Sequence, residues 1–138
     1  MQSRIKWVEN VSFLAQSESG HSVLMDGAPA AGGKNLGPRP MEMVLMGTGG
    51  CTAFDVVTIL KKGRADIVDV EVDLQAERAE TDPKVFTRIH MHFIVKGRQL
   101  KEEQVRRAIE LSADKYCSAS IMLKQTVEIT HDFEIVEV

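Results

Sequence analysis

The chain has 138 residues, of which 43% are hydrophobic and 27% charged, and its net charge at pH 7 is -3. This length provides one hydrophobic core, so we expect a single domain over residues 1–138. A pI near 5.8 is too acidic for a general nucleic-acid surface, and no nucleic-acid partner is expected. We recognise no apolar leader and no convincing membrane span, which predicts a cytoplasmic protein with no membrane partner.

Polar and apolar residues alternate in three short stretches near the N-terminus. Residues 4–8, 11–15 and 21–26 each have the period of a half-buried strand, and short turns separate them. Together they predict a three-stranded meander. Residues 27–40 are rich in glycine and proline, which indicates a long loop of a kind that is often functional or mobile.

Residues 41–60, MEMVLMGTGGCTAFDVVTIL, predict the central helix of the fold. The middle of this stretch carries no charge, and a helix that is apolar nearly all round is normally buried. Gly47, Gly49 and Gly50 each cost a helix about 1 kcal/mol relative to alanine. Glycines in such a place indicate the close approach of another helix, or of a ligand beside Cys51.

The apolar helix also bears on oligomeric state. A helix that is apolar on every side has more apolar surface than one chain of this size covers. The economical arrangement is a homodimer in which two such helices pack together, with the glycines at the contact. The alternative is a single chain that holds the helix between two of its own sheets.

The C-terminal half alternates strands with a helix. Residues 67–76, 86–96 and 125–138 have strand periodicity, residues 100–116 have the period of an amphipathic helix, and residues 118–124 predict a further helical turn. In the middle strand one predicted face is apolar and consists of Val85, Thr87, Ile89, Met91, Phe93 and Val95. The opposite face carries Phe86, Arg88, His90, His92 and Ile94. The element order predicts an α+β fold with mainly antiparallel sheets around a buried central helix.

Two cysteines, Cys51 and Cys117, lie 66 positions apart and do not make a disulfide scaffold. They are inert buried thiols, a redox pair or metal ligands. Nothing basic lies within one helical turn of Cys51, and Cys117 stands among small residues in KYCSAS. His90 and His92 could join the cysteines in a zinc site. However, compact motifs such as C-x2-C are missing, so we expect neither a metal nor a cofactor.

Several of these residues resemble the OsmC/Ohr family. The resemblance rests on Pro40-Met41-Glu42, on Gly49-Gly50-Cys51-Thr52-Ala53 and on Tyr116-Cys117-Ser118, and it extends over essentially the whole chain. It implies an intertwined α+β homodimer that reduces organic hydroperoxides with two cysteines. By the same resemblance, Cys51 matches the peroxidatic cysteine and Cys117 matches the resolving one.

The chain departs from the family pattern at two positions. The family's glutamate follows the proline directly, whereas here Met41 stands there and the candidate catalytic Glu42 comes one residue late. On a straight helix, residues 41 and 51 are separated by about 80° around the axis, and residues 42 and 51 by about 180°. The family's catalytic arginine belongs to the turn after the first strand. That turn is Glu9-Asn10 here, and Arg39 is the nearby arginine that could replace it.

Two functions follow from this reading. The first is the thiol-dependent reduction of an organic hydroperoxide by the pair Cys51 and Cys117, as part of oxidative-stress defence, with a dithiol as reductant. The second is a non-catalytic protein that binds a small apolar ligand on the same scaffold. A cysteine and histidine metal site is a third reading.

Overall fold

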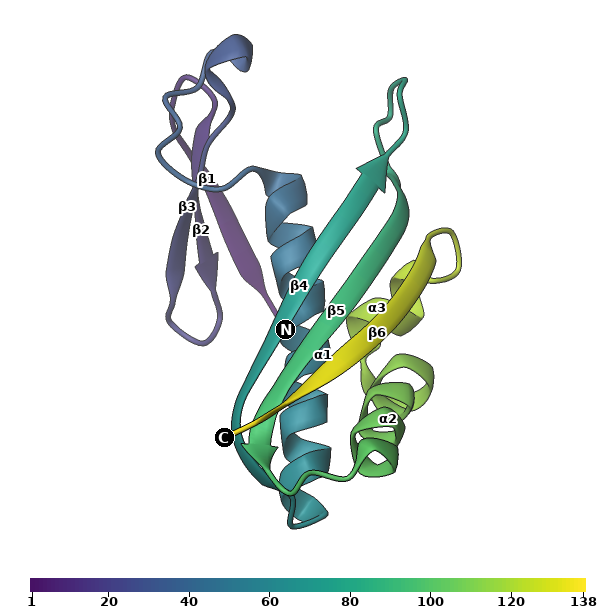
Figure 1. The fold of residues 1–138 in the computed structure, drawn as a ribbon. Helices are drawn as coiled ribbons and strands as arrows, with labels where there is room; N and C mark the ends of the chain where they lie inside the picture. The colour runs from purple at the N-terminus through teal and green to yellow at the C-terminus, as the bar shows by residue number, and fades with distance from the viewer. The chain divides into compact units, whose positions relative to one another are not determined.

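The computed structural model describes all 138 residues and divides the chain into two compact units, Met1–Val44 and Leu45–Val138, which are treated separately below. Figure 1 labels the elements along the chain. The predicted α+β class is confirmed: the chain contains two three-stranded sheets together with helices. The single-domain assignment over residues 1–138 stays a prediction.

The first unit contains the predicted meander. Strands β1 (Ser3–Glu9), β2 (Ser12–Ser17) and β3 (Ser22–Met25) form one antiparallel sheet in the order β1-β2-β3. Asn10 takes a positive φ of 48° in the first turn, a conformation that asparagine tolerates better than most residues. Every residue of β1 is exposed, including the large apolar side chains of Ile5 and Trp7.

The long loop of the first unit folds around one carboxylate. Asp26 is 2% exposed, and its two oxygens accept N–H groups from Gly27 at 2.8 Å, Lys34 at 3.0 Å and Leu36 at 3.1 Å. The N–H groups of Leu36 and Lys34 hold the pKa of Asp26 below its usual value. A short 3-10 helix, η1 (Pro29–Ala31), forms within the loop. The Gly/Pro-rich stretch is therefore a structured loop held by the carboxylate of Asp26, the residue that precedes it.

Helix α1 (Pro40–Lys62) begins in the first unit and continues into the second. The Oε1 atom of Glu42 accepts the backbone N–H of Arg39 at 2.9 Å, which caps the start of the helix. Lys61 and Lys62 stand at its C-terminal end, where cations oppose the helix dipole. α1 is long and apolar enough to cross a membrane, a property that core helices share, so this feature does not decide where the protein resides.

The second unit is built on a sheet with strand order β4-β5-β6 (Figure 1). Strands β4 (Asp66–Arg78) and β5 (Phe86–Arg98) are antiparallel. Strand β6 (Glu128–Glu137) runs parallel to β5. A parallel neighbour requires a crossover, and it is provided by α2 (Glu102–Leu111), the π-helical turn η2 (Ser112–Tyr116) and α3 (Ser118–Leu123). The predicted helix over residues 100–116 is thus a shorter α-helix followed by a π turn.

One face of this sheet carries the core. The fully or nearly fully buried apolar side chains come from α1, β5 and α2, and comprise Val56, Leu60, Ile89, Met91, Phe93, Val95, Val105, Ala108 and Ile109. Gly49 faces the sheet directly, because a Cβ atom there would lie 2.6 Å from Cδ1 of Leu74. The close approach predicted from the glycines therefore occurs at Gly49, and the approaching group belongs to strand β4.

The other side of α1 is exposed on the single chain, and its burial in a homodimer stays a prediction. Met46 and Phe54 are 51% and 71% exposed. Gly47 and Gly50 lie on the same stripe, and nothing stands within 4 Å of a Cβ built on either. These four residues, called the open stripe below, form a large exposed apolar surface on one chain.

The predicted alternation of β5 is wrong at its beginning. Phe86 is 7% exposed and belongs to the core, whereas Val85 is 52% exposed and precedes the strand. An irregularity in the pairing between Glu77 and Arg78 of β4 shifts the register there, and a one-residue shift exchanges the faces of a strand. From Ile89 onward the predicted faces are confirmed.

Candidate functional site

The structure brings the two cysteines together within the second unit. Cys51 lies on α1 and is half-buried, and Cys117 follows the π turn and is fully buried. The Cys51 side chain is close enough to the Cys117 thiol to raise its pKa, and both thiols are free. The chain between residues 51 and 117 thus folds so that the two thiols are neighbours, and proximity of this kind is needed before two cysteines can form a disulfide.

The π turn determines the position of Cys117. Its N–H donates to the carbonyl of Ser112 at 2.8 Å, a bond that closes the wide turn after α2. Cys117 is also the N-cap of α3, and its Sγ accepts the N–H of Ser120 at 3.4 Å. Cys117 is therefore held by two hydrogen bonds, one from its own N–H to the preceding turn and one to its sulfur from the first turn of α3.

The surroundings of Cys117 act on its acidity in opposite directions. Burial raises the pKa of the thiol, since a thiolate loses solvation there. Hydrogen bonds from the hydroxyl and the N–H of Ser120 oppose that rise, and the neighbouring Cys51 adds to it. The net effect is to raise the pKa of Cys117, and Cys117 is also the less accessible of the two thiols.

A buried polar network joins the elements that carry the two cysteines. The hydroxyls of Thr52 and Ser112 lie 2.9 Å apart, and Ser112 donates to Oδ2 of Asp55 at 3.0 Å. Thr52 and Ser112 are 2% and 0% exposed. Thr52 is adjacent to Cys51 in sequence, and Asp55 lies one helical turn further on. The network therefore holds the π turn against α1 directly beside the thiols.

A cavity of about 380 Å³ continues from this network. It is lined by Asp55, Thr58, Ile59, Lys62, Leu111 and Tyr116. Asp55 and Ile59 continue the helical stripe that begins at Cys51, since residues four apart share one face of a helix. Tyr116 directly precedes Cys117. A small ligand with an apolar part could therefore lie between α1 and the end of α2, although neither cysteine lines this cavity.

Glu42 and Arg39, the other two candidate residues, bond to each other and to the loop in the first unit. Glu42 accepts the N–H of Arg39, and its Oε1 lies 4.0 Å from Nε of the same residue. The Arg39 guanidinium donates to Oδ1 of Asn35 at 2.7 Å and to the carbonyl of Gly37 at 3.2 Å. These contacts give both side chains a structural role at the start of α1. A catalytic role for Glu42 stays a prediction.

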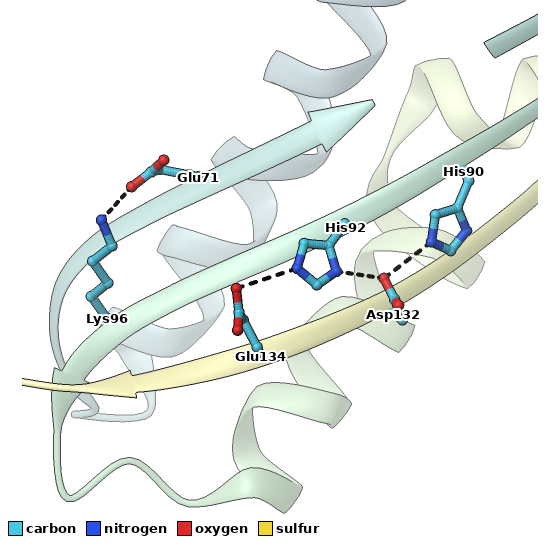
Figure 2. A network of polar contacts seen from close by, with 6 residues as sticks. All are labelled: Glu71, His90, His92, Lys96, Asp132 and Glu134. Atoms are coloured by element: carbon cyan, nitrogen blue, oxygen red, sulfur yellow. Dashed lines mark hydrogen bonds and ion pairs between the residues drawn. The ribbon is translucent and has the colours of Figure 1, made fainter. Parts of the chain in front are cut away.

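His90 and His92 belong to a different network, on the face of the sheet opposite the core (Figure 2). Asp132 Oδ1 lies 3.1 Å from Nε2 of His90 and 2.7 Å from Nδ1 of His92, and Glu134 Oε1 lies 3.5 Å from Nε2 of His92. Hydrogen bonds to Asp132 and Glu134 raise the pKa of His92, and the bond to His92 lowers that of Asp132.

This placement bears on the metal reading. The histidines bond to acids on β6, while the cysteines lie among the helices, so the four side chains do not form one set. Nor do any three or more His, Cys, Asp or Glu side chains form a group that could hold a metal ion. Lys96, further along the same face, bonds to Glu71 (Figure 2). Its Nζ atom also lies 3.5 Å from Oδ2 of Asp69. The outer face is a ladder of cross-strand ion pairs.

Sequence reasoning missed the polar residues around the thiols. The sequence does not mark Asp55, Ser112 or Ser120 as site residues, and Thr52 enters only as part of the motif that resembles the family. One signal was present: Asp55 ends the uncharged run of residues 43–54 in the helix, four residues after Cys51. Its partner Ser112 is distant in sequence, so only the fold reveals why that acid is tolerated.

Comparison with known proteins agrees with this geometry. A family model described as OsmC-like protein matches residues 32–132. Protein YhfA of Escherichia coli (strain K12) is 57% identical over 136 residues, which are 99% of this chain and 98% of that protein. A structural-genomics structure is 54% identical, with a TM-score of 0.92 over 100% of both chains. An organic hydroperoxide resistance protein OsmC from Legionella pneumophila is 13% identical, with a TM-score of 0.74 over 96% of this chain and 95% of that one, which is a likeness of fold.

Proposed function

Because this chain belongs to the OsmC family, we propose that it reduces organic hydroperoxides with the pair Cys51 and Cys117, in the cytoplasm and at the expense of a dithiol. The observation that supports this most directly is the proximity of the two free thiols, seen in the effect of Cys51 on the pKa of Cys117. The Legionella protein, which is named for organic hydroperoxide resistance, shares the fold.

The reaction has two covalent steps on the protein. The Cys51 thiolate attacks the terminal oxygen of the hydroperoxide, the O–O bond breaks, and the alkoxide leaves and takes up a proton. This step leaves a sulfenic acid on Cys51. The Cys117 thiolate then attacks that sulfur, the S–O bond breaks, and the hydroxide leaves as water while the 51–117 disulfide forms. A dithiol reduces the disulfide and restores both thiols.

The exposure of the two thiols supports this order. Cys51 is half-buried, so a hydroperoxide can reach it, whereas Cys117 is fully buried and has Cys51 as its neighbouring thiol. A thiol that solvent cannot reach is unsuited to the first attack. It is well placed for the second attack, which is intramolecular and needs only the neighbouring sulfur.

The cavity beside Asp55 favours an alkyl or aryl hydroperoxide over hydrogen peroxide. Ile59, Leu111 and Tyr116 offer apolar surface along the stripe that leads from Cys51. Each CH2 group that a substrate buries there contributes about 0.8 kcal/mol, a gain that hydrogen peroxide cannot make.

The test is hydroperoxide consumption by the wild-type protein with a dithiol reductant. We expect cumene or tert-butyl hydroperoxide to be consumed faster than in protein-free buffer and faster than hydrogen peroxide at the same concentration. The rate should be low compared with that of a dedicated peroxidase, because the side chains of Glu42 and Arg39 are bonded to groups of their own loop. Consumption no faster than the protein-free background would rule out the peroxidase.

The same contacts favour the second candidate, a protein that binds a small apolar ligand on the OsmC scaffold without turnover. The Glu42 carboxylate caps α1 and the Arg39 guanidinium bonds to Asn35 and Gly37, so neither group is bonded to Cys51 as an activating partner. If no hydroperoxide is consumed, an apolar ligand that binds saturably and protects Cys51 from alkylation would identify this function.

We also propose that the protein is a homodimer that buries the open stripe. Phe54 and Met46 are too exposed for a stable soluble surface, and Gly47 and Gly50 leave room for a second backbone. Sedimentation equilibrium at micromolar concentration should give twice the chain mass of 15.3 kDa.

Substitutions at two neighbouring glycines test the dimer interface and the stability of the fold independently. Gly50→Asp places a charge on the open stripe and should give a folded monomer by circular dichroism and sedimentation. Gly49→Asp, the matched variant, places the charge against Leu74 and should unfold the chain, because an unpaired buried charge is very costly. A wild-type monomer, or a Gly50→Asp protein that still dimerises, would exclude this interface.

A further inference from the structure

The fully buried thiol Cys117 is held in an environment that opposes its ionisation, yet the second step proposed above needs its thiolate. The core side of the sheet offers no help, because its β5 residues Ile89, Met91, Phe93 and Val95 are apolar. Helix α3 has no titratable side chain. Some other group must stabilise negative charge on this sulfur.

Ser120 is the residue that meets this need. It is 4% exposed, and its backbone N–H donates to the Cys117 Sγ at 3.4 Å. Its hydroxyl acts as a second donor, which lowers the pKa of the Cys117 thiol. Both groups act on a single atom, and hydrogen bonds of this kind strengthen when the acceptor becomes charged.

We propose that Ser120 is a further functional residue, whose N–H and hydroxyl stabilise the Cys117 thiolate that attacks the oxidised Cys51. The proposal rests on the resolving role of Cys117 in the proposed function. It assigns to Ser120 the second covalent step alone, since the residue contacts Cys117 and its hydrogen bonds do not reach Cys51.

The other charged and titratable groups near Cys117 are accounted for. Cys51 faces the sulfur from α1, and its proximity disfavours a second negative charge. Asp55 reaches the segment through Ser112, whose carbonyl accepts the Cys117 N–H. Lys115 and Tyr116 are exposed neighbours in sequence. Ser120 is thus the group that directly favours the charged form.

The test measures the two thiols in sequence with the chromogenic disulfide dithiobis(nitrobenzoate). The Cys51 thiolate attacks the reagent, which releases one thionitrobenzoate and leaves a mixed disulfide. The Cys117 thiolate then attacks that disulfide, forms the 51–117 bond and releases a second thionitrobenzoate. The rate of the second release follows the thiolate fraction of Cys117 as the pH is raised.

Ser120→Ala removes the hydroxyl donor and keeps the N–H. We expect the midpoint of the second release to rise by about one pH unit, and its rate at neutral pH to fall by about threefold to tenfold, since fewer thiolates form but each is more nucleophilic. The first release should be unchanged. Ser118→Ala, at the exposed first position of α3, is the matched control and should behave as wild type.

Three results would overturn the inference. A midpoint unchanged in Ser120→Ala means that the hydroxyl does not act on the thiolate. A rate that falls equally at every pH, including the alkaline plateau, means that the residue only positions the sulfur. A wild type that releases one thionitrobenzoate means that Cys117 does not resolve Cys51. Failure of the proposed function is seen separately, as an absence of hydroperoxide consumption in a protein that passes this test.

Discussion

A Cys117→Ser protein is expected to consume a single equivalent of organic hydroperoxide and then stop, with a sulfenic acid on Cys51. Serine keeps the size and the hydrogen-bonding capacity of Cys117 but cannot form a disulfide. The oxidised Cys51 then has no partner within reach, because Cys117 is the thiol that meets it. Trapping with dimedone and peptide mass spectrometry should locate the adduct at Cys51, and turnover with a dithiol should fall strongly.

Cys51→Ser is the matched variant, and it should lose the first reaction with hydroperoxide as well as the second step. It leaves Cys117, which is fully buried, so neither hydroperoxide consumption nor a dimedone adduct is expected. Mild oxidation of the wild type should instead give an intramolecular 51–117 disulfide in non-reducing peptide maps. Equal background rates in the wild type and both variants would remove the peroxidase, and free labelling of both thiols after oxidation would remove the resolving role of Cys117.

The elements that could be predicted from the sequence are those whose burial is periodic. The meander β1-β2-β3, helix α1 and the apolar face of β5 from Ile89 onward follow from local alternation or from local apolar runs. Pairing partners do not follow from periodicity. That β6 joins β5 in parallel depends on a crossover whose path is determined by packing of α2 and α3. The π turn likewise has no pattern of its own, and appears in sequence as the end of a longer helix.

The site was predicted less completely than the fold. The roles of Cys51 and Cys117 came from the family resemblance, because nothing in either local sequence distinguishes a reactive thiol from an inert one. The two thiols become neighbours only when the chain folds, so their proximity cannot be predicted from local sequence. The residues that support it are serines and a threonine, which are ordinary on surfaces and become informative only when burial forces each hydroxyl to find a partner.

The buried network should control how well the thiols meet, and Ser112→Ala tests this. The hydroxyl of Ser112 is bonded to both Thr52 and Asp55 at a fully buried position. Its removal leaves two polar partners unsatisfied, so the free energy of unfolding should fall by about 1–3 kcal/mol in urea titrations. The bond from the Cys117 N–H to the Ser112 carbonyl is main-chain and survives, so the chain should still fold.

The effect on the disulfide is what distinguishes a network that aligns the thiols from one that only stabilises the core. If the network holds the π turn against α1, Ser112→Ala loosens the approach of Cys117 to Cys51. The 51–117 disulfide should then become easier to reduce in a glutathione buffer, by about tenfold in its equilibrium constant for a loss of about 1.4 kcal/mol. Thr52→Val keeps the Ser112–Asp55 bond and should show a smaller effect. A stability loss with an unchanged disulfide equilibrium would assign the network to the core alone.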